Sequence, residues 1–309
     1  MSARRTGAAA GIGATLAAAV LWGSSFSVND VGLRYVGPGT FALLRFAIGG
    51  VAAVGLLALL GRADTRLLRQ RWFWMLCAAN AFAFLLQYVA QTMTTPARTA
   101  LFVNTSAFTV ALIERVFFHM RMGSARWLAV ALGFVGASIL IVGDDPRAIL
   151  GGQLVGDLVA MTAGLVWAVF FVMNDRAVER EDPAHLAAWT FVGTATVLLA
   201  APLLDPWLAR PQTLGWTPTA FAAILYSGIV TTALAFGLWT YGLTRVRASV
   251  SAVLLMVEIL VASLVSVALG RESFGLVELA GAAVLVVAVM LASAVARADA
   301  PAATAQNVR

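Results

Sequence analysis

The sequence has no lysine, one cysteine and two histidines, and only 12% of its 309 residues are charged. Without lysine the chain cannot form a phosphate-binding GxxxxGK[ST] loop, which excludes direct coupling to ATP within this chain. The single cysteine, Cys77, allows no intramolecular disulfide. His119 and His185 lie far apart and have no cysteine or carboxylate cluster at metal-ligand spacing. We therefore expect no metal, no cofactor and no catalytic residues.

The scarcity of charge accompanies an excess of apolar residues. Hydrophobic residues make up 61% of the chain, and its mean hydropathy is +0.88. Soluble domains carry roughly 25% charged residues, and a chain with half of that cannot cover a surface that faces water. This excludes a soluble enzyme, a nucleic-acid-binding module and a secreted disulfide scaffold. The composition predicts an integral membrane protein.

Ten apolar runs are long enough to cross a bilayer, which takes about 20 residues of helix. Backbone groups in lipid must be paired within the segment, so these runs are predicted to be helices. The fold class is therefore all-α, with ten transmembrane helices. The predicted spans are residues 10–30, 39–60, 72–92, 97–117, 125–143, 154–174, 184–204, 218–241, 248–269 and 276–296.

The arginines predict how the chain is oriented. With the amino terminus in the cytoplasm, 15 of the 21 arginines fall on the cytoplasmic side, five on the other side, and Arg45 within the second helix. Basic residues collect in short cytoplasmic loops. We therefore predict that both termini face the cytoplasm, in a bacterial inner membrane.

The two halves of the chain resemble each other at a constant offset of 145 residues. Nine of the 36 positions from residue 11 to 46 are identical to their counterparts. The matches include Trp22 with Trp167 and Asn29-Asp30 with Asn174-Asp175. Five helices in each half, an odd number, mean that the second half is threaded in the opposite direction. Inverted repeats are typical of transporters that bind substrate near the bilayer midplane, at the interface between the repeats.

Several motifs resemble the EamA family of the drug/metabolite transporter superfamily. They are Leu21-Trp22-Gly23-Ser24-Ser25-Phe26, the Pro38-x-x-Phe41-Ala42-x-x-Arg45-Phe46 pattern, residues 100–106, residues 231–236 and Glu258. The resemblance implies two five-helix repeats, residues 10–143 and 154–296, followed by a short cytoplasmic tail at 297–309. It also implies transport of small molecules, commonly export of amino acids or related metabolites.

Helical spacing selects candidate substrate-binding residues. Trp22 and Phe26 share one helix face, and Trp167 and Phe171 share the matching face in the second repeat. Two such faces predict an aromatic clamp, and ordinary helix packing is the alternative. Asn29 and Asn174 lie near helix ends, where capping or structural packing is expected.

Polar residues within the spans form a second group of candidates. Gln87 and Gln91 belong to a polar stripe on the third helix, and Asn104 lies in the middle of the fourth. A polar side chain in lipid is costly unless it faces protein or water. We predict that these residues line a cavity, although hydrogen bonds between helices would also satisfy them.

Three of the charged residues within the spans are considered as candidates. Glu258 sits near the bilayer centre, where a carboxylate is a functional candidate by default. It could hold a substrate amine, carry a proton, or pair with Arg45 or a hydroxyl group. Arg45 is either structural or a partner for a substrate carboxylate. Glu114 is expected to be solvated or paired with a loop.

The sequence thus predicts a secondary transporter that exports amino acids, aromatic or apolar ones among them, or similar metabolites. The expected partners are a small-molecule substrate and the lipid bilayer, with no nucleic acid, and the chain is expected to be a monomer or a weak homodimer. One alternative is uptake or exchange of sugars or organic cations. An integral membrane enzyme that modifies lipids is a more distant alternative.

Overall fold

The computed structural model describes residues 7–120, 122–143, 153–208, 215–270 and 274–299. Within these ranges nine helices are long and apolar enough to cross a membrane. The first half of the chain contains α1 (Ala8–Leu33), α2 (Pro38–Leu59), α3 (Arg71–Met93), α4 (Pro96–Val103), α5 (Ser106–Val116) and α6 (Ser124–Val142). A short 3₁₀ helix, Arg66–Arg69, precedes α3.

The second half repeats this order. It contains α7 (Leu154–Ala177), α8 (Pro183–Val197), α10 (Pro218–Tyr226), α11 (Ala235–Leu243), α12 (Ala248–Leu255), α13 (Val257–Ala268) and α14 (Leu276–Ala298). A 3₁₀ segment, Leu198–Leu204, and the short α9 (Asp205–Leu208) extend α8. A π-helical segment, Ser227–Leu234, joins α10 to α11. The fold is an all-α membrane fold, as predicted.

Local sequence accounts for where many helices begin. Proline is the first residue of α2, α4, α8 and α10, a position where its missing N–H costs no helical hydrogen bond. At three of these starts a side chain caps the helix by accepting a backbone N–H. Thr95 accepts from Arg98, Asp182 from His185 and Thr217 from Ala220.

The predicted span at residues 97–117 is not one helix. It is broken at Asn104 and Thr105 into α4 and α5, and the corresponding span of the second half is broken at Met256 into α12 and α13. The prediction of a continuous helix was therefore wrong here. Breaks at membrane depth are tolerated where the backbone is buried in protein or lines a cavity, and both breaks lie about midway along their spans.

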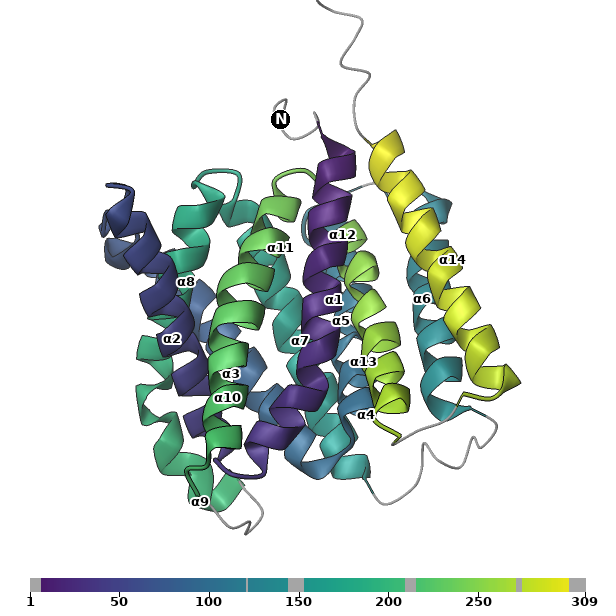
Figure 1. Cartoon of the computed structure of the whole chain (residues 1–309). Coiled ribbons are helices and arrows are strands. Elements are labelled where there is room, and N and C mark those ends of the chain that lie inside the picture. The colour runs from purple at the N-terminus through teal and green to yellow at the C-terminus, as the bar shows by residue number, and fades with distance from the viewer. Residues whose placement is uncertain (1–6, 121, 144–152, 209–214, 271–273, 300–309) are drawn as a thin grey trace, which may run out of the picture.

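The packing of the helices is related by the repeat. The α3–α7 contact corresponds to that of α1 with α10 and α11, and the α4/α5–α7 contact corresponds to α13–α1. Helices α2 and α8 form one flank of the molecule, and α6 and α14 form the other (Figure 1). The first residue of α1 and the last of α14 lie at the same end, at the top of Figure 1.

We call this end the arginine-rich end, because most of the described arginines lie there. They are Arg62, Arg66, Arg69, Arg71, Arg115, Arg126, Arg176, Arg180, Arg245, Arg247 and Arg297. Ion pairs join its loops, with Arg62 on Asp182 and Arg66 on Glu181. The other end, which we call the opposite end, carries Arg34 and Arg98 among the described arginines.

The flank made by α6 and α14 depends on close backbone contact. A Cβ atom added to Gly281 would lie 2.4 Å from the backbone nitrogen of Leu140, and one added to Gly136 would lie 2.5 Å from that of Leu285. Because neither contact is with a flexible side chain, the helices would have to separate. Small residues at helix interfaces in membranes allow this approach.

We expect Gly281→Ala to destabilise the protein by about 1–3 kcal/mol, the usual cost of overpacking. Gly13 is the matched control, since a Cβ added there meets nothing within 4 Å. Thermal unfolding in detergent should show a lower midpoint for Gly281→Ala and no loss for Gly13→Ala. Equal midpoints would contradict the role of this contact.

Candidate functional site

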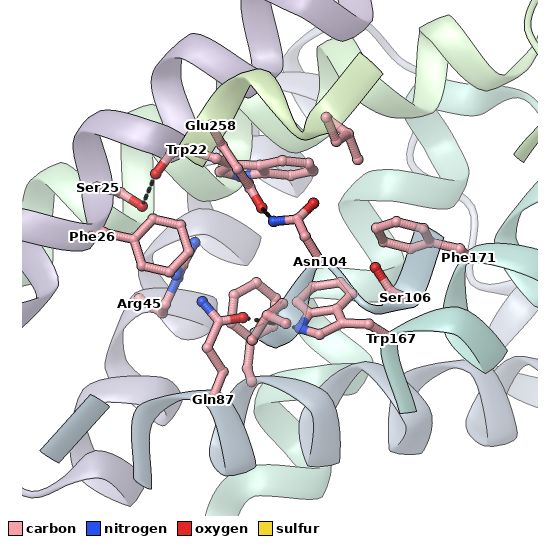
Figure 2. A pocket seen from close by; sticks show the side chains of 13 residues that line it. Trp22, Ser25, Phe26, Arg45, Gln87, Asn104, Ser106, Trp167, Phe171 and Glu258 are labelled. Carbon is pink, nitrogen blue, oxygen red and sulfur yellow. Dashed lines mark hydrogen bonds between the residues drawn. The ribbon is translucent and has the colours of Figure 1, made fainter. Parts of the chain in front are cut away.

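A cavity lies where α1, α2, α3, α7 and the two broken spans meet (Figure 2). It holds about 480 Å³ of space free of atoms, including space open to solvent. Five aromatic rings line it, together with one carboxylate and one guanidinium group. The lining residues are Trp22, Ser25, Phe26, Arg45, Phe84, Gln87, Val103, Asn104, Ser106, Trp167, Phe171, Leu255 and Glu258.

The two helix breaks bring an amide and a carboxylate together. Asn104 ends α4, and Glu258 lies in the first turn of α13. Asn104 Nδ2 donates to Glu258 Oε1 over 2.5 Å (Figure 2). It also donates to the carbonyl of Ala100 over 2.8 Å. Only 3% of Asn104 and 8% of Glu258 is exposed. The expected alternatives for Glu258, a pair with Arg45 or with a hydroxyl group, are not what the structure shows.

Helix α1 packs against the backbone of Glu258. A Cβ atom added to Gly23 would lie 2.6 Å from the carbonyl oxygen of Glu258. The absence of a side chain at Gly23 therefore lets α1 pack directly against the start of α13. Glu258 Oε2 has no hydrogen-bond partner among the described residues, so this oxygen can accept a donor from a ligand.

Arg45 is fully buried among hydroxyl groups and rings. Its Nε donates to Thr232 Oγ1 over 2.8 Å, its second terminal nitrogen donates to Thr231 Oγ1 over 3.0 Å, and the first contacts the Tyr88 hydroxyl. The guanidinium carbon lies 4.5 Å from the ring centre of Phe84. In the described part of the chain no carboxylate forms an ion pair with it, so its charge has no protein counter-ion there.

The two repeat-related tryptophans are held by their indole N–H groups. Trp22 Nε1 donates to the carbonyl of Thr231 over 2.7 Å, and Trp167 Nε1 donates to Gln87 Oε1 over 2.9 Å. Thr231 belongs to the π-helical segment, and such irregular turns often occur at functional sites. With the N–H groups occupied, the apolar ring faces are what remains for the cavity.

All but one of the predicted substrate-binding residues line this cavity. The exception is Gln91, whose Nε2 donates to the carbonyl of Phe26 over 2.6 Å. Gln91 therefore joins α3 to α1, which is the alternative stated for the polar stripe. Helical spacing offered a signal for two lining residues that were not predicted, since Ser25 is three residues from Trp22 and Phe84 three from Gln87. The full set of unpredicted lining residues is Ser25, Phe84, Val103, Ser106 and Leu255.

One other expectation, that for Glu114, needs correction. Glu114 is 3% exposed, so it is buried instead of solvated or paired with a loop, and its Oε1 accepts from the backbone N–H of Ser249 at the start of α12. Asn29 follows the structural-packing alternative, since it is buried and accepts from Ser227 Oγ over 2.8 Å. Among the described residues, no three His, Cys, Asp or Glu side chains are placed to hold a metal ion.

Known proteins share similarity with this chain in sequence and in fold. An uncharacterized transporter of Bacillus subtilis is 24% identical, over 90% of this chain and 92% of its own. A probable amino-acid metabolite efflux pump of Salmonella typhimurium is 27% identical, over 86% of this chain and 89% of its own. A crystal structure with 21% identity has the same fold, with a TM-score of 0.75 over 95% of this chain and 99% of that one.

The model of the EamA-like transporter family matches the chain twice, at residues 9–142 and 154–294. Each match covers one set of helices in the repeated order described above. Together they span most of the 309 residues. The chain belongs to the EamA-like transporter family.

Proposed function

We propose that this protein exports amino acids, aromatic or other apolar ones among them, or similar small metabolites, by alternating access. The name of the Salmonella typhimurium relative, a probable amino-acid metabolite efflux pump, supports the substrate class. The cavity supports it independently, through the chemistry of its lining. The polar part of the substrate would contact Gln87, Asn104 and Glu258, and the apolar part would contact Trp22, Phe26, Trp167 and Phe171.

One observation carries the proposal: Glu258 and Arg45 line the same cavity and do not pair with each other. A buried charge without a partner is costly, and its cost falls when a ligand supplies the opposite charge. An amino acid carries an ammonium and a carboxylate group on the same carbon atom. It can therefore complement Glu258 and Arg45 together, while its side chain contacts the rings.

The arginines support the orientation that we propose. Basic residues are enriched in short cytoplasmic loops. We therefore propose that the arginine-rich end, where α1 begins and α14 ends, faces the cytoplasm. We propose that the membrane is the inner membrane of a bacterium. The two repeats and the two broken spans are features of transporters that rock one half against the other around a central site.

An organic cation is the second candidate substrate. Glu258 and the rings of Trp22 and Trp167 favour it, because aromatic faces attract cations. A cation would leave the guanidinium of Arg45 without a counter-ion, which is why we prefer a zwitterion. Sugar uptake has no comparable support from the lining, since neither charge would be matched.

Flux into proteoliposomes tests the substrate class. Reconstituted protein should accelerate the movement of labelled phenylalanine or leucine, and an excess of an unlabelled amino acid should compete. The matching amine, which lacks the carboxylate, should compete poorly. Competition by the amine but not by the amino acid would favour the organic cation, and no flux of either would refute the proposal.

Substitution of Glu258 separates a role in substrate binding from a role in proton coupling. Glu258→Gln keeps the size and the hydrogen bond to Asn104 but removes the charge. If Glu258 holds a substrate amine, binding should weaken about tenfold to a hundredfold, the value of a hydrogen bond to a charged group. If it carries a proton, binding should persist while acceleration by a pH gradient is lost. Wild-type flux with and without a gradient would exclude both roles, and Glu179→Gln, at an exposed carboxylate, is the control.

The aromatic clamp predicts a separate effect. Trp22→Ala and Trp167→Ala should each lower the affinity for aromatic or apolar amino acids about twofold to tenfold, the value of an aromatic contact. Trp207→Ala is the control, because that side chain is 79% exposed in α9. If both cavity variants fold and transport normally, these tryptophans are packing residues.

A further inference from the structure

Two buried asparagines, Asn80 on α3 and Asn174 on α7, lie in the layer where α3, α7, α8 and α11 pack together. These helices run in opposite directions, and Gln87 contacts Trp167 across them. Asn80 lies seven residues before Gln87, and Asn174 seven residues after Trp167. Seven residues are about two helical turns. Both asparagines therefore lie two turns from the Gln87–Trp167 contact, in the direction of the arginine-rich end, on the faces of α3 and α7 that pack together. Asn80 is 0% exposed and Asn174 is 1% exposed.

The hydrogen bonds of this layer are incomplete. Neither the nitrogen nor the oxygen of the Asn174 amide has a partner among the described residues, and Asn80 Oδ1 has none either. Asn80 Nδ2 donates to Thr194 Oγ1 over 2.9 Å. The hydroxyl groups of Thr190 on α8 and Thr240 on α11 are also buried without partners in the described part of the chain. Buried polar groups are nearly always hydrogen-bonded, so each exception needs an explanation.

The first repeat shows how the equivalent asparagine is hydrogen-bonded. Asn29 is the counterpart of Asn174 and lies seven residues after Trp22, toward the opposite end. Its amide is paired, because Ser227 Oγ donates to its oxygen over 2.8 Å and its nitrogen donates to Ser25 Oγ over 3.5 Å. This pair of equivalent asparagines is thus hydrogen-bonded toward the opposite end and unsatisfied toward the arginine-rich end.

We propose that the layer between α3, α7, α8 and α11 is the path by which the substrate enters the cavity from the arginine-rich end. When this end opens, water and the polar groups of the substrate complete the hydrogen bonds of Asn80, Asn174, Thr190 and Thr240. When it closes, as in the structure, those bonds are lost. This inference rests on the proposed function for the nature of the substrate and for the side of the membrane.

The chain carries a natural reporter for the opening. Cys77, its one cysteine, lies on α3 three residues before Asn80, and its Sγ is 3.9 Å from the carbonyl oxygen of Thr190. It is 0% exposed. A reagent that dissolves only in water can therefore reach Cys77 when the layer is hydrated and is excluded when it is closed.

The experiment measures how fast a membrane-impermeant quaternary-ammonium thiosulfonate modifies Cys77 in sealed vesicles of either orientation. We expect modification in the native fold when the reagent is added at the arginine-rich end, which the proposed orientation makes the cytoplasmic side. Ile224→Cys in a Cys77→Ser background is the matched control. Ile224 is 2% exposed and lies six residues into its span from the opposite end, as Cys77 does from the arginine-rich end.

Reagent should modify Cys77 at least about fivefold faster than the thiol introduced at position 224, each treated from the end nearer to it. Asn174→Leu should slow the modification of Cys77 about fivefold or more, because it removes buried groups that only an open layer satisfies. Modification of Cys77 only after unfolding, equal rates at both positions, or an unchanged rate in Asn174→Leu would overturn the proposal. Because labelling needs no substrate, a failed amino-acid flux test would leave this result standing.

Discussion

A carboxylate in the middle of an apolar bilayer must be paired, hydrated or protonated, and the centre of this molecule is arranged around that requirement. Glu258 can meet Asn104 because both spans break at the same depth, which turns the end of α4 toward the start of α13. The Asn104 amide also donates to the carbonyl of Ala100 next to the break. The broken backbone and the carboxylate therefore lie together, and the Asn104 amide hydrogen-bonds to both.

The repeat builds a symmetric scaffold that carries asymmetric chemistry. Tryptophan occurs at both repeat-related positions of the cavity, and each indole N–H is bound by a neighbouring span. Charge is different, since the offset of 145 residues relates Arg45 to Thr190, and the cavity carries a single carboxylate, Glu258. Symmetry is what permits two alternating states, and the unequal side chains are what a substrate would recognise.

Most of the fold could be predicted from the sequence, because membrane helices follow from runs of about 20 apolar residues. The cavity aromatics followed from helical spacing within a single span. The break at Asn104 could not be predicted, since residues 97–117 are mainly apolar and contain no proline or glycine. The burial of Glu114 escaped prediction for another reason: its partner is the backbone of Ser249, which lies 135 residues later in the chain.

Buried polar groups without hydrogen-bond partners affect the balance between the closed and the open state of the arginine-rich end. A population shift from 1:99 to 99:1 takes about 5.5 kcal/mol, and each buried group without a partner costs about 1–3 kcal/mol. The unpaired groups of Asn80, Asn174, Thr190 and Thr240 are therefore enough, in kind and number, to move the balance between a closed and an open layer. At the opposite end the Asn29 amide is paired, while Ser27 Oγ, Gln91 Oε1 and Ser263 Oγ are buried without partners among the described residues. Under the proposed path, hydration of these groups favours opening at the arginine-rich end, which is where an exporter must collect its substrate.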